Sequence, residues 1–167
     1  MTLLRTLDRI LVRIETALLV LFLGVMVLLA FGQVVLRNLF DAGFLWGDTV
    51  VRHLVLWAGF IGGALASSEE RHIGIDALTK FISDRTKSFV HIFTNLFAAV
   101  VCVFLASAAL EFLLSEREAA SVIILAIPTW VGISVVPVGY AMMAFHFLVR
   151  SVENALRAWH GTHEAAA

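Results

Sequence analysis

Two pairs of ionisable residues are spaced so that a helix would bring their side chains together. Asp48 and Arg52 lie four positions apart, as do His72 and Asp76, so each pair shares a helical face. The first pair predicts a local ion pair at a helix start, where an acid also suits the helix dipole. The two side chains of the second pair are too few ligands for a metal site, and no nucleophile accompanies them for acid–base chemistry. We therefore expect a structural hydrogen bond between them. We predict no catalytic residue, no metal site and no enzyme.

Two functions remain open on chemical grounds. His91 and His146 lie at similar depth in two apolar segments, so a haem between them would make the chain an electron-transfer membrane subunit. A self-contained small exporter would need an acid inside the membrane, and Glu15 is the candidate in the first segment but lies close to its end. The centres of the apolar segments carry no charge, so we expect no proton relay, no ion path and no bound cofactor.

Long apolar segments must position these residues. They span about 17–36, 50–67, 89–114 and 127–148, and 60% of all residues are hydrophobic whereas 15% are charged. Each segment approaches the roughly 20 helical residues that cross a hydrocarbon core of about 30 Å. The predicted fold is therefore all-α and integral to the membrane, with four transmembrane helices in a single domain over residues 1–167.

Two shorter stretches have the apolar periodicity of helices that lie on a membrane surface. Residues 3–14 alternate Leu and Ile with Arg and Asp at helical spacing, and residues 75–82 show a similar pattern. We predict short amphipathic surface helices there. For residues 3–14 the alternative is a polar extension of the first transmembrane helix.

The basic residues are unevenly divided between the two sides of the predicted bundle. With four crossings, both termini share one side with the middle loop, and nine of the twelve Lys and Arg residues fall there. The positive-inside rule places that side in the cytoplasm. These residues are scattered among acids and form no basic face, so no nucleic-acid partner is expected.

The second and fourth apolar segments carry packing signals. Small residues in the second segment would let another helix approach closely. They are Ala58, Gly59, Gly62, Gly63 and Ala66. In the fourth segment, Pro128 suits a helix start, and Pro137 predicts a kink near Ile133 and Ser134.

The order of several motifs resembles one membrane-protein family. Trp46, Asp48 and Arg52 are followed by Trp57, the Gly59 to Gly63 segment and the run His72-Ile73-Gly74-Ile75-Asp76. The segment Ala126-Ile127-Pro128-Thr129-Trp130 follows later. Together they resemble the small membrane subunit, the DctQ-like component, of tripartite ATP-independent periplasmic (TRAP) transporters. The family often has paired glutamates after the tryptophan, where this sequence has Gly47 and a single acid, Asp48.

The resemblance implies a scaffold in the bacterial inner membrane. Such a subunit braces a large multi-span subunit that imports an organic acid with sodium, after a periplasmic substrate-binding protein has captured that acid. Sodium would bind the large subunit, and membrane lipids would surround both. The residues implied as partner contacts are Trp46, Asp48, Arg52, Trp57, His72, Asp76, Pro128 and Trp130.

Overall fold

The computed structural model describes residues 2–43, 46–68, 84–124 and 127–164. Its long helices are α1 (Thr2–Phe40), α2 (Gly47–Ser68), α4 (Asp84–Glu118) and α6 (Val135–Glu164). Four helical segments are long and apolar enough to cross a membrane, namely Thr6–Phe40, Gly47–Ser68, Val90–Glu118 and Thr129–Leu156. The all-α membrane fold with four spans is therefore confirmed.

Helix α1 corrects one prediction about the N-terminal region. Residues 3–14 form no separate surface helix, because α1 is one helix from Thr2 to Phe40. The sequence contains no proline in this range and its first glycine is Gly24, so nothing interrupts the backbone hydrogen bonds near residue 15. The alternative of a polar extension of the first span describes the structure. The predicted surface helix at residues 75–82 lies outside the described residues.

The segment that precedes α6 is less regular than the sequence predicted. The short strands β1 (Val122–Ile124) and β2 (Ile127–Pro128) pair antiparallel, and Val122 lies opposite Pro128. The fourth predicted span therefore begins in a strand, two residues before helix α5 (Thr129–Ile133). The two strands are only three and two residues long, which is too short to give an alternating pattern in the sequence.

The predicted break near Ile133 and Ser134 is present. Helix α5 ends at Ile133, α6 begins at Val135, and the Ser134 amide donates to the Val131 carbonyl three residues back. Pro137 consequently falls in the first turn of α6, where its missing N–H leaves no helical hydrogen bond unmade.

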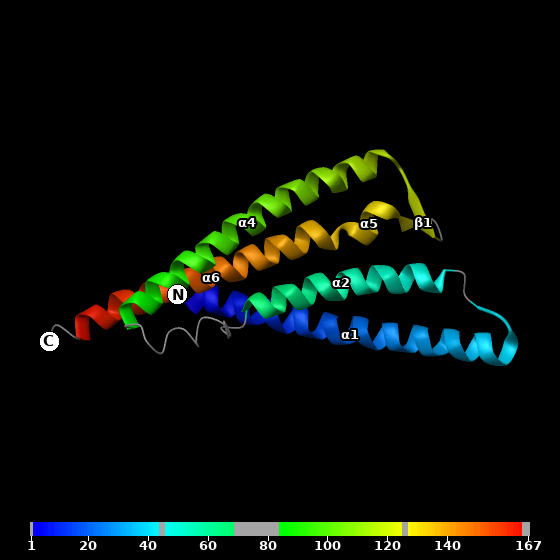
Figure 1. Ribbon diagram of the computed structural model, residues 1–167, viewed down its shortest axis with the longest axis horizontal. Helices are drawn as coiled ribbons and strands as arrows, with labels where there is room; N and C mark the ends of the chain where they lie inside the picture. Colours follow the sequence, from blue (N-terminus) through cyan, green and yellow to red (C-terminus); the bar gives the residue numbers. More distant parts are fainter. Residues whose placement is uncertain (1, 44–45, 69–83, 125–126, 165–167) are drawn as a thin grey trace.

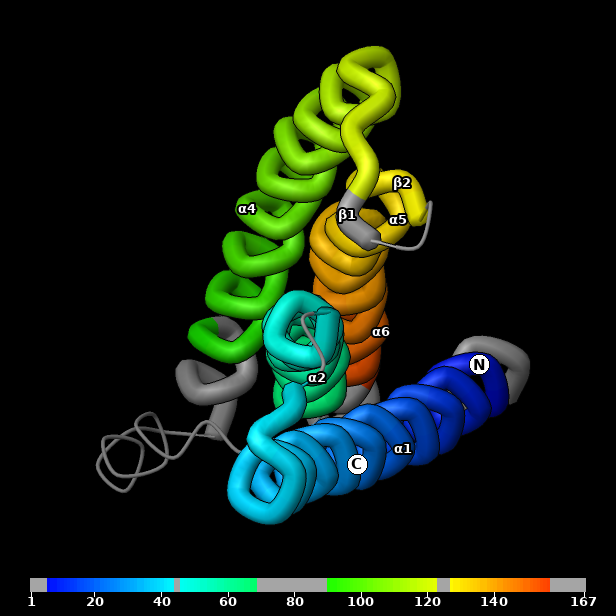
Figure 2. The backbone as a smooth tube through the Cα atoms, turned by 90° about the vertical axis from the view of Figure 1, so that its right-hand side faces the viewer, coloured from blue at the N-terminus to red at the C-terminus, as the bar shows by residue number. Residues whose placement is uncertain are grey.

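The long helices are arranged in the order α1, α2, α6, α4 (Figures 1 and 2). Helices α2 and α6 run parallel, because residues further along α2 meet residues further along the α5–α6 segment. The successive contacts are Trp57 with Gly132, Gly63 with Met143, and Ser68 with Arg150. We call the end where α1 begins and α6 finishes the terminal end (Figure 1). The opposite end, with the α1–α2 connection and the strands, is the loop end.

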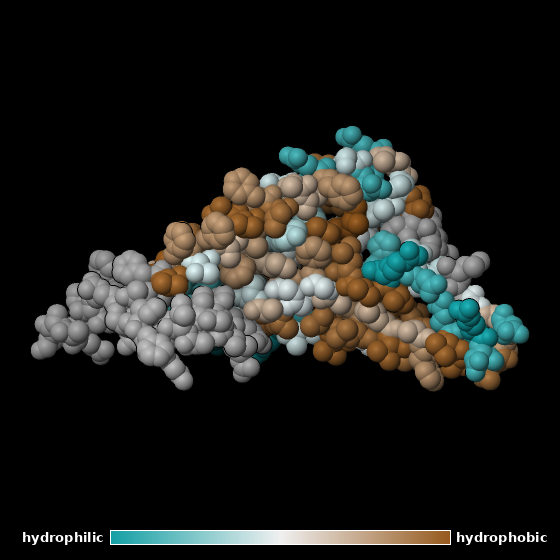
Figure 3. Space-filling model, viewed as in Figure 1, coloured by the Kyte–Doolittle hydropathy of each residue, from teal (hydrophilic) through white to brown (hydrophobic). Residues whose placement is uncertain are grey.

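Little of the apolar surface is buried inside the chain. The buried hydrophobic positions are mostly small or medium-sized, such as Ile61, Ala64, Ala99 and Ala144. Large apolar side chains of the outer helices face outward, among them Leu28, Phe31, Phe93 and Phe104. Figure 3 shows the resulting apolar surface, with hydrophilic residues gathered toward the loop end. Such a surface suits lipid or an apolar protein partner rather than water.

Candidate functional site

The most concentrated polar chemistry lies at the terminal end, where α6 meets the first turns of α1. His146 Nδ1 lies 2.8 Å from Asp8 Oδ1, and His146 Nε2 lies 2.9 Å from Glu15 Oε1. The His146 and Glu15 side chains are completely buried, whereas the Asp8 side chain is 16% exposed. One imidazole therefore bridges two carboxylates that lie two helical turns apart.

A second polar group lies one turn further along α6. The guanidinium of Arg150 donates through Nη2 to the Ser68 carbonyl at the C-terminus of α2, and its Nη1 lies 3.3 Å from Glu153 Oε2. A cation at a helix C-terminus is favourable, because the last carbonyls carry partial negative charge. Arg150 thus ties α6 to the end of α2.

This terminal-end cluster was missed from the sequence. On sequence grounds His146 was considered as a haem ligand with His91, and Glu15 as the acid of an exporter, and no contact between His146 and Glu15 was predicted. The available signal was that Asp8 and Glu15 lie seven residues apart, which places two acids on one face of a continuous helix. Nothing in the sequence indicates that His146, 131 positions beyond Glu15, lies against that face.

At the loop end, the predicted pair of Asp48 and Arg52 is arranged differently from the prediction. The Asp48 carboxylate accepts a hydrogen bond from Gln33 Nε2 of α1 at 3.1 Å. Arg52 Nε instead donates to the Asp48 main-chain carbonyl at 3.3 Å. Arg52 therefore meets Asp48 through the main chain, and the Asp48 carboxylate bonds to Gln33 on the antiparallel neighbour instead of pairing with Arg52 as predicted.

Trp57 joins three helices within the chain. Its indole Nε1 donates to the Gly132 carbonyl of α5 at 2.8 Å, and its ring meets Phe22 of α1 edge to face at 5.7 Å. A buried indole N–H normally needs such an acceptor. The placement gives Trp57 a structural role in the chain, and its predicted partner contact stays a prediction.

The other predicted partner residues that the structure describes gather at the loop end. Trp46 precedes α2, Pro128 precedes α5, and Trp130 lies in α5, where its half-buried ring is 5.9 Å from the Arg117 guanidinium. Figure 1 shows the starts of α2 and α5 at this end of the molecule. His72 and Asp76 lie outside the described residues.

The predicted small-residue face of α2 divides between two environments. A Cβ on Gly63 would lie 2.7 Å from Met143 Cε, and one on Gly62 would lie 3.9 Å from Leu19 Cδ1, so these glycines adjoin α6 and α1. Gly59 has nothing within 4 Å of that position. Ala58 is half-buried and Ala66 is exposed. A further close approach was not predicted: a Cβ on Gly139 of α6 would lie 2.8 Å from Phe60 Cδ1.

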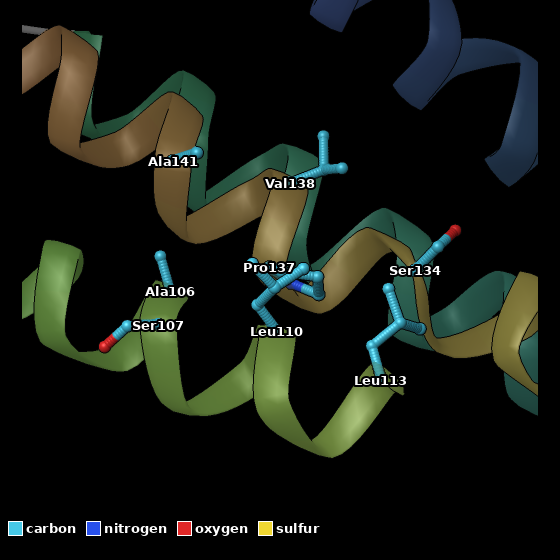
Figure 4. A pocket seen from close by; sticks show the side chains of 8 residues that line it. All are labelled: Ala106, Ser107, Leu110, Leu113, Ser134, Pro137, Val138 and Ala141. Atoms are coloured by element: carbon cyan, nitrogen blue, oxygen red, sulfur yellow. The ribbon is translucent and has the colours of Figure 1, made fainter. Parts of the chain in front are cut away.

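An open groove of about 370 Å³ separates α4 from the α5–α6 break. Its lining residues are Ala106, Ser107, Leu110, Leu113, Ser134, Pro137, Val138 and Ala141. Figure 4 shows Leu110 and Leu113 on α4 opposite Pro137 and Ser134. Because the lining contains no charged side chain, this groove has nothing to compensate the charge of an organic acid.

A comparison with protein families identifies the family of this chain. The model described as "Tripartite ATP-independent periplasmic transporters, DctQ component" matches residues 26–157, well over half of the chain. The chain belongs to the DctQ family of TRAP transporter components. The resemblance inferred from the sequence motifs is thereby confirmed, and the protein is a small TRAP permease subunit and a multi-pass membrane protein.

Individual DctQ relatives match over shorter stretches. The chain is 31% identical over 74 residues to the C4-dicarboxylate TRAP transporter small permease protein DctQ of Vibrio cholerae, covering 44% of this chain and 32% of that one. A provisionally named TRAP transporter small permease protein of Haemophilus influenzae is 28% identical over 80 residues, 48% of this chain and 50% of that one. The sialic acid TRAP transporter permease protein SiaT of H. influenzae is 27% identical over 73 residues, 44% of this chain but 12% of that one. The matches thus span at most half the length of these relatives.

Membership of the DctQ family also decides between the chemical alternatives. Its members are transporter components, which confirms the prediction that the chain is not an enzyme. His146, one of the two histidines considered for haem, has both ring nitrogens against carboxylates in this structure.

Proposed function

We propose that this DctQ-like chain is the scaffold that braces the large membrane subunit of a sodium-coupled TRAP transporter importing an organic acid. The observation that carries the proposal is the family match over residues 26–157 of a chain whose open groove is apolar. Sodium and substrate would then bind the large subunit, and a periplasmic protein would deliver the acid. No cofactor is expected on this chain.

The outward apolar faces support a scaffold role. Large hydrophobic side chains cover the outer helices α1 and α4, and a scaffold needs such a surface to meet both lipid and the spans of a partner. The contacts expected at the loop end include Trp46, Asp48, Arg52 and Trp130. Arg52 is exposed on α2, so its charge is accessible to an acidic group of the partner.

The distribution of basic residues supports an inner-membrane topology with both termini in the cytoplasm. The first part of α1 contains Arg9 and Arg13, whereas the loop end has the fewer basic residues of the two sides. Reporter fusions to each terminus, active only on one side of the membrane, would test this orientation. A periplasmic signal at either terminus would contradict it.

The decisive experiment is affinity purification of the tagged chain in mild detergent from its native membrane, followed by mass spectrometry. We expect a large multi-span protein in about equal amount. The pair, reconstituted with its periplasmic protein, should take up one of a panel of organic acids only with a sodium gradient. Recovery of the chain alone would overturn the scaffold role, and uptake without sodium would overturn the coupling.

A charge reversal tests the proposed contact at Arg52. Arg52→Glu should reduce recovery of the large subunit, because it places an acid where a cation is expected to meet one. Arg37→Glu is the matched control, since Arg37 is an exposed arginine at the same end, in the last turn of α1. Equal recovery with both variants would remove Arg52 from the interface.

A further inference from the structure

The polar cluster of α1 and α6 has a property that neither the family nor the scaffold role accounts for. Each ring nitrogen of His146 lies within 3 Å of a carboxylate oxygen, Nδ1 against Asp8 and Nε2 against Glu15. A nitrogen and a carboxylate oxygen attract at this distance only when a hydrogen lies between them. Two contacts therefore require two protons.

Counting protons shows what the three groups must hold. Two ionised carboxylates and a neutral imidazole contain one N–H, which can satisfy only one of the two contacts. The second contact then sets a nitrogen lone pair against an anion. An additional proton on the ring, which makes it an imidazolium, completes both hydrogen bonds and changes the charge of the cluster from −2 to −1.

Burial makes this additional proton important. Glu15 is completely buried, and its second oxygen, Oε2, has no hydrogen-bond partner within the described part of the chain. His146 is thus the donor on which a Glu15 carboxylate depends, and a buried carboxylate without a donor is strongly disfavoured. Asp8 is partly exposed and can be hydrated instead.

The surrounding elements carry further charged and titratable groups. On α6, Arg150 donates to the Ser68 carbonyl and pairs with Glu153. The part of α2 from Gly59 to Ser68 contains no ionisable side chain. Helix α4, which packs on α6, carries Asp84, Arg85, Lys87 and His91 in its first turns, followed by Asn95 and Cys102, and Arg9 and Arg13 of α1 are exposed.

We propose that Asp8, His146 and Glu15 form a proton-binding site whose bound proton holds the first turns of α1 against α6. When the proton leaves, the remaining N–H stays on Nε2 beside the buried Glu15, and the contact with Asp8 opens because water can take its place. The ligand of this site is a proton drawn from the aqueous side at the terminal end. The site concerns the chain's own helices and does not depend on which acid the transporter carries.

Substitutions can supply the missing hydrogen without the proton. In Glu15→Gln, the new amide can donate to Nε2 while Nδ1–H donates to Asp8, so a neutral imidazole completes both contacts. Asp8→Asn does the same from the other side. Both variants should keep α1 on α6 yet lose the pH dependence, which separates proton binding from simple packing.

The test measures the distance between α1 and α6 in the full chain in lipid nanodiscs from pH 5.5 to pH 9.5. Spin labels would be attached at Ile10→Cys and Val152→Cys, both about half exposed, after Cys102→Ala removes the native thiol. We expect a single short distance at low pH and a growing longer one as the pH rises. Glu15→Gln should keep the short distance throughout, and His146→Ala should show the longer distance at every pH.

Nitrogen NMR of the labelled imidazole gives an independent readout. The His146 signal, assigned by its loss in His146→Ala, should show two protonated ring nitrogens at low pH and one in Glu15→Gln at the same pH. His53, whose Nδ1 lies 2.8 Å from the Thr49 carbonyl of its own helix, serves as the internal reference. The proposal would be overturned if the α1–α6 distance of the wild type did not change with pH. It would also be overturned if the distance in Glu15→Gln changed with pH as it does in the wild type. Neither outcome would affect copurification with a large subunit, so the scaffold role fails or stands separately.

Discussion

The two ends of this bundle are held together by different kinds of interaction. At the terminal end, His146 bridges Asp8 and Glu15, with His146 and Glu15 completely buried, and Arg150 binds the end of α2. At the loop end, single hydrogen bonds join Gln33 to Asp48 and Trp57 to Gly132. Figures 1 and 2 show α1 and α4 spread apart there.

This difference indicates how a small bundle of membrane helices can be firmly held at one end and open at the other. Charged contacts gain strength where water is excluded, and losing one partner leaves the other buried and unpaired. The terminal end therefore fixes the relative positions of α1, α2 and α6. The loop end, with weaker contacts, leaves more of its helix surface uncovered for other molecules.

Among the variants that test the difference between the two ends, His146→Ala should lower the free energy of unfolding most. The substitution leaves Glu15 buried without its donor, so we expect the free energy of unfolding in detergent to fall by about 3 kcal/mol. His53→Ala is the control, because that ring is half-buried and bonds within its own helix. An equal loss of unfolding free energy in the two variants would mean that the contacts of His146 with Asp8 and Glu15 stabilise the fold no more than those of His53 do.

A steric change between the two ends should have the next largest effect. The Cβ of Gly139→Ala would lie 2.8 Å from Phe60 Cδ1 and 2.9 Å from Phe60 Cβ, so the ring and its backbone must shift. We expect a loss of about 1–3 kcal/mol, measured by the same unfolding assay. Gly59→Ala has open space at its Cβ and should be neutral or gain at most about 1 kcal/mol. A loss from Gly59→Ala as large as that from Gly139→Ala would contradict the packing of α2 on α6.

Trp57→Phe should weaken the loop end moderately. The phenyl ring can still meet Phe22, but the hydrogen bond to Gly132 is lost, at a cost of about 1 kcal/mol. Hydrogen exchange should become faster in α5 while α1 near Glu15 stays protected. Trp130→Phe is the matched control, and faster exchange at the terminal end would show that the two ends are coupled.

The smallest effect is expected for Gln33→Leu. This residue donates one hydrogen bond to Asp48 at an exposed position, so its loss should cost at most about 0.5 kcal/mol. Thermal unfolding of the Gln33→Leu and Trp57→Phe variants in one series would show which of them loses more stability. A greater loss than that from Trp57→Phe would make the α1–α2 contact, and not the α2–α5 contact, the principal link at the loop end.

Local features of the fold could be predicted because their causes are local. The four spans follow from runs of apolar residues, and the break before Val135 follows from Pro137, whose ring prevents one backbone hydrogen bond. Helical spacing placed Arg52 beside Asp48, but it could not show that Arg52 bonds the Asp48 main-chain carbonyl or that Gln33 of another helix bonds the carboxylate. The strands β1 and β2 were missed because a ladder of so few residues has no period to detect.

The sequence by itself determined the membrane location, the number of spans and the family, since these depend on hydrophobicity, proline placement and the order of motifs along the chain. Only the tertiary structure decided that His146 lies between Asp8 and Glu15, that Trp57 bonds to Gly132, and that Gly139 rather than Gly59 meets another helix closely. These contacts join residues about 75 or more positions apart. Their existence depends on the order and tilt of the helices, which no local pattern encodes.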